Sequence, residues 1–257
     1  MVLAAVALFS LLYFGFGTQP ASFKDVEKQR ALGAVSTDIN AMLRDARKEL
    51  SPQESASVLA LETELEKAID TAKAAPYKRL SSLWYNLGKP GISGFYAEKA
   101  AELERTEEAW SIAGTTYSIC LQTEQVDKVK QYCTQRAVQA LESAASINPD
   151  NLQHNVNLAL VYAENPPQDN PMKGVMMLVE MNKQNPGNPM VLTQLGRLAI
   201  KTGQYDKAAE RLEAALEAQP DNAPAACLLA QAYEGIGNSD KAKEYQSKCD
   251  QLSGRRD

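Results

Sequence analysis

Three short proline-containing phrases recur in the second half of the chain. They are NPDN at residues 148–151, NPGN at 185–188 and QPDN at 219–222. Their prolines, Pro149, Pro186 and Pro220, lie 37 and 34 residues apart. Self-similarity at a nearly fixed period predicts a repeat architecture, in which each unit buries its apolar face against its neighbours. The chain is therefore expected to stack helical units rather than to fold around one central core.

Alignment on these prolines brings small residues into register. The first column holds Gly114, Ala159, Gly196 and Ala230, the second holds Ala137, Gly174, Ala208 and Ala242, and the third holds Ala144, Met181, Ala215 and Cys249. Antiparallel helices approach closely only where both facing surfaces are small. Glycine inside a helix costs roughly 1 kcal/mol relative to alanine, so Gly114 indicates a need for close approach. We expect the second helix of that hairpin to approach Gly114 at Ala137.

These residues resemble the tetratricopeptide repeat, whose first helix carries Trp, then Leu-Gly, then Tyr, and whose second carries Ala, Phe, Ala and Pro. The match is best at residues 192–220, and Trp110, Gly114 and Tyr117 fall at the family's Trp, Gly and Tyr positions. The resemblance implies an all-α, right-handed superhelical solenoid over residues 107–252, with a degenerate first repeat at 76–106. In the first full unit, LQTEQVDKVKQY either separates the two helices or extends the second.

The N-terminal residues carry no charge before Lys24, and their apolar part covers residues 2–17. A helix that crosses a bilayer core needs about 20 residues, although about 17 suffice with local thinning. We therefore expect a transmembrane helix within residues 1–23, with a cleaved signal segment as the alternative. A helical linker or stalk over residues 24–75 and a disordered tail at 253–257 complete the predicted organisation.

The linker is expected to contain two helices that are separated near residue 51. Ser51 suits an N-cap and Pro52 suits the first helical position. Glu54 stands where the acceptor of a capping box is found. The second linker helix is therefore predicted to begin at Pro52.

Two signals disagree on the side of the membrane. Lys24, Lys28 and Arg30 follow the apolar run and would hold that end in the cytoplasm under the positive-inside rule. A disulfide within a hairpin would instead favour an oxidising compartment. With its anchor, the chain is similar to single-span bacterial repeat proteins of cytochrome c maturation and of translocon-associated quality control. We therefore expect a single-pass inner-membrane protein whose repeat domain is periplasmic.

The resemblance also implies a peptide-binding groove lined by the first helices of the hairpins. The corresponding residues are Ser111, Thr115, Val156, Leu160, Met190, Thr193, Arg197, Lys201, Cys227 and Gln231. Ser111 and Thr115 stand where the family's carboxylate clamp has Lys and Asn, which argues against a receptor for chaperone C-terminal tails. Arg197 and Lys201 are one helical turn apart and either hold an acidic group or form a solvated helix face.

Four cysteines have different expected roles. Cys120 and Cys133 lie at the two ends of the inserted segment, one closing a helix and the other opening the next, and are a candidate disulfide. Cys227 falls on the groove side and Cys249 in a small-residue column, so these two are interpreted as small buried apolar residues, with a disulfide between them as the alternative. No C-x-x-C occurs in the sequence, which argues against a redox enzyme.

The composition excludes several classes of function. A net charge of −5 and a pI near 5.2 argue against nucleic acid as a partner. The single histidine, His154, is expected at the surface or at a helix start, and it cannot by itself form a His-based metal site. No phosphate-binding loop or metalloprotease motif is found, so we expect no catalytic residues, no metal, no cofactor and no small-molecule substrate.

Core packing is predicted for the methionines Met172, Met176, Met177 and Met181, with an adaptable binding surface as the alternative.

Together these features predict a membrane-anchored interaction scaffold and not an enzyme. Its expected partners are protein or peptide clients that bind in the groove during assembly or export at the cell envelope. The alternative is a permanent structural subunit of an envelope membrane complex.

Overall fold

The computed structural model describes residues 39–254, which form helices and connecting turns without a strand. The chain divides into two compact units between Ser57 and Val58, within helix α3 (Pro52–Lys67). In the first unit, residues 39–48 are helical. The Ser51 backbone N–H donates to Glu54 Oε2 at 2.8 Å, and the Glu54 N–H donates to Ser51 Oγ at 3.3 Å. The predicted capping box at the start of α3 is confirmed.

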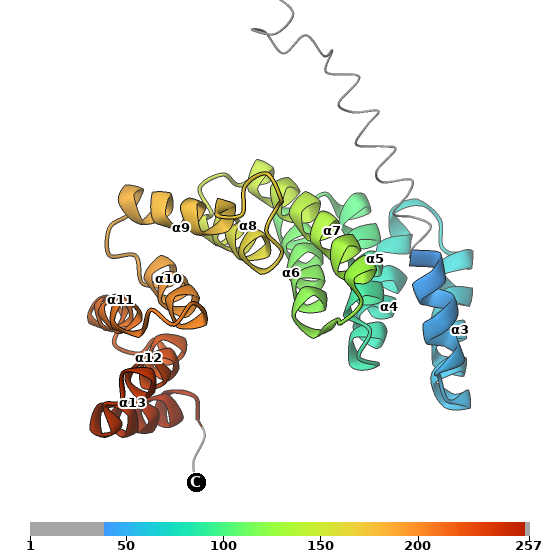
Figure 1. The fold of residues 1–257 in the computed structure, drawn as a ribbon. Coiled ribbons are helices and arrows are strands. Elements are labelled where there is room, and N and C mark those ends of the chain that lie inside the picture. The colour runs from blue at the N-terminus through green and yellow to red at the C-terminus, as the bar shows by residue number, and fades with distance from the viewer. Residues whose placement is uncertain (1–38, 255–257) are drawn as a thin grey trace, which may run out of the picture. The chain divides into compact units, whose positions relative to one another are not determined.

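The second unit continues through the 3-10 turn η1 (Asp70–Lys73) into successive helical hairpins (Figure 1). They are α4 (Ala74–Asn86) with α5 (Pro90–Glu104), α6 (Glu107–Thr123) with α7 (Asp127–Ile147), α8 (Leu152–Glu164) with α9 (Lys173–Gln184), α10 (Pro189–Lys201) with α11 (Tyr205–Ala218), and α12 (Ala223–Ile236) with α13 (Ser239–Leu252). Each hairpin packs on the next one along the chain. The prediction of an all-helical solenoid is confirmed.

The proline phrases end one hairpin and begin the next. Asn151, Asn188 and Asn222 are the N-caps of α8, α10 and α12, and each side chain accepts a hydrogen bond from a backbone N–H of the first turn. Such a side chain satisfies a donor that the helix itself leaves without a partner. The first residue of each phrase closes the preceding helix through its own backbone N–H. This chemistry fixes where each repeat starts.

The small-residue columns lie inside the hairpins. In the α8/α9 hairpin they meet as predicted, because a Cβ on Gly174 would lie 2.3 Å from the Ala159 backbone oxygen, but at Gly114 and Gly196 the partner differs. A Cβ placed on Gly114 would lie 2.6 Å from Cγ of Leu141, and the same atom on Gly196 would lie 2.6 Å from Cγ of Leu212. Gly114 therefore makes room for Leu141, one turn beyond Ala137, so the predicted partner was wrong. At Gly114 and Gly196 the glycine admits a leucine side chain of the second helix instead of bringing two small residues together.

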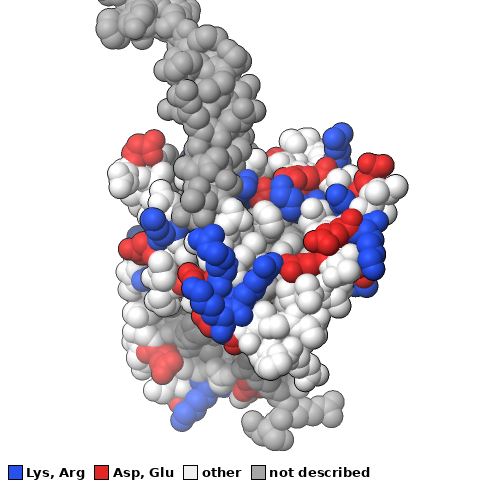
Figure 2. All heavy atoms as spheres, turned by 90° about the vertical axis from the view of Figure 1, so that its right-hand side faces the viewer, with Lys and Arg blue, Asp and Glu red and all other residues white. Residues whose placement is uncertain are grey.

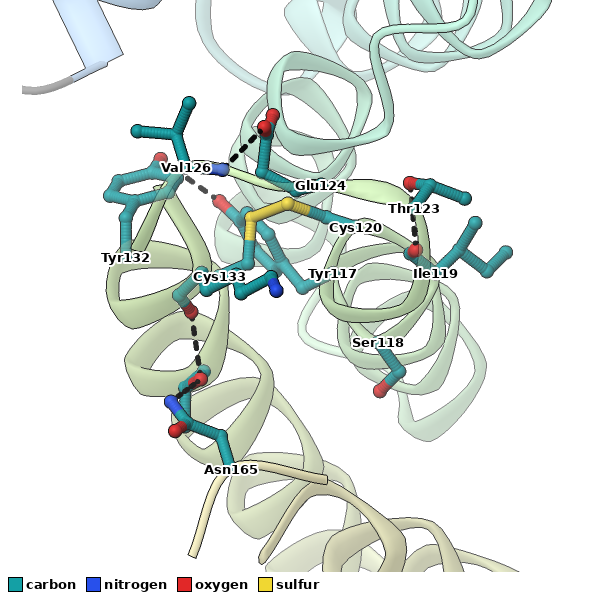
Figure 3. The surroundings of a disulfide bond; sticks show 12 residues. Tyr117, Ser118, Ile119, Cys120, Thr123, Glu124, Val126, Tyr132, Cys133 and Asn165 are labelled. Atoms are coloured by element: carbon teal, nitrogen blue, oxygen red, sulfur yellow. Dashed lines mark hydrogen bonds between the residues drawn. A yellow bond between two sulfur atoms is a disulfide. The ribbon is translucent and has the colours of Figure 1, made fainter. Parts of the chain in front are cut away.

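The inserted segment in the α6/α7 hairpin lengthens the helices. Helix α6 has 17 residues and α7 has 21, and a short turn joins them. Cys120 near the end of α6 and Cys133 in the second turn of α7 form a disulfide with Cα atoms 6.2 Å apart (Figure 3). This is the pair that the sequence offered as a candidate. The bridge fixes the end of the hairpin at which the extra residues lie.

A second disulfide joins Cys227 and Cys249, whose Cα atoms are 4.8 Å apart. The interpretation of these two as unbridged apolar residues was wrong. In an antiparallel hairpin the first turns of one helix lie opposite the last turns of its partner. Cys227 lies early in α12 and Cys249 lies late in α13, so the topology places them side by side.

The predicted membrane anchor lies outside the described residues, as does the end of the predicted tail at 255–257. Among residues 39–254, no helix combines the length and apolar character that crossing a membrane requires. The methionine prediction is wrong in part. Met181 is 7% exposed and packs in the core. Met172, the N-cap residue of α9, is 55% exposed, and Met176 is 60% exposed on the side of α9 that faces away from the core.

Candidate ligand-binding groove

The residues predicted to line a groove lie on the first helices of the hairpins, but they differ in accessibility. Ser111, Thr115, Leu160, Met190, Arg197 and Cys227 are half-buried, Lys201 and Gln231 are exposed, and Val156 and Thr193 are buried. The hydroxyl of Thr115 already donates to the backbone oxygen of Ser111 in its own helix at 2.8 Å. The set is therefore not one continuous accessible surface.

Three members of this set cannot offer a free side chain, so the prediction is wrong for them. Val156 is fully buried within an apolar cluster. The Thr193 hydroxyl donates to Pro189 O at 2.6 Å and accepts from Asn222 Nδ2 at 3.2 Å. Val156 and Thr193 lie three residues before the small column, and residues at that spacing share the face that turns to the core. The sulfur of Cys227 is bonded to Cys249.

Arg197 and Lys201 do not form one anion site. The ammonium group of Lys201 pairs with Glu164 of the preceding hairpin at 2.7 Å. Nε of Arg197 is buried, and no atom of the described chain accepts a hydrogen bond from it. One cation is thus already neutralised, which favours a structural role for Lys201 between hairpins over the prediction of a paired acidic-group site.

A hollow that the sequence did not indicate lies between α4, α5 and α6, with a cavity volume of about 240 Å³. Helix α4 contributes Lys78 and Ser82, α5 contributes Glu104, and α6 contributes Glu108 and Ile112. We call this hollow the α4–α6 groove. Ile112 is 50% exposed, so half of its apolar side chain faces the groove and solvent. Its apolar surface is available for a ligand.

The α4–α6 groove carries charges of both signs, one lysine and two glutamates. Nζ of Lys78 lies 2.5 Å from Oε1 of Glu104, so the groove holds an ion pair at its edge. On the face shown in Figure 2, basic and acidic side chains lie side by side. Glu108 adds a carboxylate in the first turn of α6. A ligand would therefore meet both signs of charge around an apolar centre, an arrangement suited to a peptide.

Lys78 and Ser82 were missed because the first repeat was treated as degenerate. Ser81 and Ser93 are 12 residues apart, and the Ser93 hydroxyl donates to the Ser81 backbone oxygen at 2.8 Å. Gly196 and Ala208 have the same spacing in the best-matched repeat. Serine is small enough for both columns. An alignment that allowed it would have placed Lys78 and Ser82 at the positions of Ser111 and Thr115.

One wall of the groove is held by a polar cluster at the start of α6. The Glu107 carboxylate accepts hydrogen bonds from Nδ2 of Asn148 at 2.9 Å and Nδ2 of Asn151 at 2.5 Å. Nε2 of His154 lies 2.6 Å from the same carboxylate. The bonds from the two asparagines, followed by that from His154, lower the pKa of Glu107 to about 2. This cluster joins α6 to the start of α8.

His154 lies at a helix start, as one of the two predicted alternatives had it, but it is not a surface residue. It is the third residue of α8, and its side chain is 3% exposed. The local reason is that the Asn148–Asn151 turn carries it inward toward Glu107. No group of three or more His, Cys, Asp or Glu side chains in residues 39–254 is arranged to hold a metal ion.

Comparisons with known proteins agree with the repeat architecture. Residues 193–250 match the tetratricopeptide repeat family. A thermophilic TPR protein of Thermus thermophilus has a solved structure that is similar with a TM-score of 0.52 and 19% identity, over 71% of this chain and 92% of that one. This similarity shows the fold. Among curated proteins, none matches the chain.

Two further solved structures are similar at lower TM-scores. MamA of Desulfovibrio magneticus RS-1, residues 41 to the end, has a TM-score of 0.44 and 17% identity, over 72% of this chain and 97% of that one. YrrB, described as a TPR protein with an unusual peptide-binding site, has a TM-score of 0.39 and 20% identity, over 76% of this chain and 93% of that one. The repeat assignment itself rests on the family match at residues 193–250 and on the N-cap and column pattern described above.

Proposed function

We propose that this chain, which carries tetratricopeptide repeats, is an interaction scaffold without catalytic activity, and that its α4–α6 groove binds an extended segment of a client protein. The observation that carries the proposal is the exposed Ile112 beside the Lys78–Glu104 ion pair, in a cavity of about 240 Å³. Protein ligands are held by apolar anchors in pockets with a polar rim. The groove offers both.

The test uses peptides selected from a random display library against the full chain. Ile112→Asp should weaken their binding by about tenfold or more, because it places a charge where an apolar side chain is to be buried. The matched control is Ile147→Asp. Ile147 is 47% exposed at the end of α7 and does not line the groove. If the selected peptides bind Ile112→Asp as tightly as the wild-type chain, the groove is not the site.

We further propose that the scaffold is tethered to the inner membrane by residues 1–23 and works in an oxidising compartment at the cell envelope. The apolar run at residues 2–17 supports the tether. The two disulfides support the compartment, because reducing cytosols disfavour such bonds. N-terminal sequencing of the mature protein from its native membranes would separate the alternatives. A sequence that begins near residue 20 would identify a cleaved signal segment and remove the tether.

A further inference from the structure

A second hollow lies on the side of the second helices, between α9, α10 and α11. Helix α10 packs against α9 and α11, and the hollow that these three helices line has a cavity volume of about 400 Å³. Its apolar lining comes from Val179 of α9 and from Leu192 and Leu195 of α10. Val179 is 36% exposed, whereas the two leucines are nearly covered. We call this hollow the α9–α11 groove.

The charges around the α9–α11 groove are mainly positive. Lys183, Lys207 and Arg211 line it together with one carboxylate, Glu210. The whole chain carries a formal charge of −5, so this local excess of cations is opposite in sign to the protein's average. A site lined mainly by one sign of charge attracts ligands of the opposite sign.

The cations of this groove are only weakly neutralised from within the chain. Lys183 lies 3.4 Å from Glu180 in an exposed pair, and the Lys207 ammonium donates to the neutral Gln204 side chain at 3.0 Å. Nη1 of Arg211 donates to the backbone oxygen of Leu195 at 3.2 Å. That bond fixes the guanidinium beside the apolar lining. A guanidinium carries five N–H donors, and this bond uses one of them.

A hydrogen-bond acceptor in the same groove is left without a partner. Oδ1 of Asn182 is buried, and no donor of the described chain reaches it. Asn182 lines the groove next to Lys183. Buried acceptors are normally satisfied, so this oxygen is an exception within the described chain. Its burial keeps it out of reach of a bound peptide, so the groups of this groove that can bind a ligand are its cations and its apolar side chains.

We propose that the α9–α11 groove is a second docking surface, which binds an acidic segment of a partner protein with an apolar side chain between carboxylates. The apolar side chain enters the hollow against Val179, and the carboxylates meet Lys183 and Lys207. A membrane surface fits less well, because lipid binding favours apolar side chains that protrude, and this surface is hollowed. The proposal does not depend on the α4–α6 groove, which lies on other helices.

The test measures fluorescence anisotropy of the labelled hexapeptide Glu-Asp-Leu-Leu-Asp-Glu with the full chain in neutral detergent at low ionic strength. Its amide analogue, Gln-Asn-Leu-Leu-Asn-Gln, should bind about tenfold more weakly or worse. The variant Lys183→Glu/Lys207→Glu should lose about tenfold in affinity for the acidic peptide, because both attractions become repulsions. Raised salt should weaken the wild-type interaction.

The matched control, Lys128→Glu/Lys243→Glu, makes the same charge change at exposed positions outside the groove and should leave the affinity unchanged. Ile112→Asp should also leave it unchanged, which separates this surface from the α4–α6 groove. Equal binding of the two peptides, or equal losses in both charge-reversal variants, would overturn the proposal. The proposal would also be overturned if the chain bound phosphatidylserine vesicles through Lys183 and Lys207 and did not bind the peptide.

Discussion

Removal of the Cys227–Cys249 bridge by Cys227→Ala/Cys249→Ala should release the last helix of the solenoid. The bridge closes a segment of 22 residues, and loop-closure entropy for such a length corresponds to about 3 kcal/mol. Cys249 is the buried residue of α13, while Ala242, Tyr245 and Leu252 are only partly covered. Tyr245 stacks on Tyr233, and Lys241 Nζ donates to the Tyr233 hydroxyl at 2.7 Å, and the double variant keeps both contacts. The local opening free energy of α13 should therefore fall by the contribution of the bridge alone.

Hydrogen exchange followed by mass spectrometry measures this opening directly. A loss of about 3 kcal/mol corresponds to a decrease of roughly a hundredfold in the protection of α13 amides, since about 1.4 kcal/mol is tenfold. Peptides from α6 and α7 should exchange as in the wild-type chain, because repeat solenoids open locally. The reciprocal control is Cys120→Ala/Cys133→Ala, which should deprotect the α6/α7 end and leave α13 unchanged. Unchanged exchange in α13 would show that packing, and not the bridge, holds the helix.

Three further variants test the packing and the buried charges. Gly114→Ala should destabilise the fold by about 1–2 kcal/mol in urea unfolding, because the clash with buried Leu141 outweighs the gain of about 1 kcal/mol in helix propensity; a more stable variant would show that Leu141 can move. Glu107→Gln should remove a pH dependence: the folded pKa of Glu107 is lowered from 4.5 to about 2, so its stabilisation is present above pH 4.5 and is lost as the pH falls toward 2. An acid titration of the unfolding free energy that is identical in the variant would contradict this. Burial raises the pKa of Glu98 despite the nearby Arg136. The contribution of Glu98 to the free energy of unfolding is therefore largest below pH 4.5 and declines as the pH rises through the folded pKa. Glu98→Gln should not show that decline when unfolding is measured from pH 4 to pH 7.

The repeat boundaries were predictable because local chemistry determines them. Asn151, Asn188 and Asn222 cap the following helices through contacts within a few residues, so the phrase alone carries the information. The small columns were predictable for a different reason. Their period reflects a requirement of close packing that every hairpin shares. The partner of Gly114 was not predictable in the same way, because the choice between Ala137 and Leu141 depends on how far one helix slides along the other.

The candidate site was harder to predict than the fold. Val156 and Thr193 lie at groove positions by alignment, but a small rotation of each helix turns such residues into the core. The α4–α6 groove depends on serine in place of alanine or glycine in the small columns, which weakened the pattern at Ser81 and Ser93. The excess of cations in the α9–α11 groove comes from two helices of successive hairpins, which α10 separates in the sequence. No local sequence pattern therefore indicates that these cations lie close together.

The α6 helix connects the stability of the fold to the proposed function. Glu107 ties its first turn to the turn before α8, and a buried network of Tyr117, Tyr132, Glu98 and Arg136 ties its last turns to α5 and α7. Figure 3 shows Tyr117 and Tyr132 beside the disulfide that closes the same end. A helix fixed at both ends presents Ile112 to the groove in one orientation. In the proposed function, a client would bind a surface that is already formed, and less of the interaction energy would be lost to ordering the receptor. The polar clusters that stabilise the hairpin therefore also support affinity in the groove, although none of their side chains lines it.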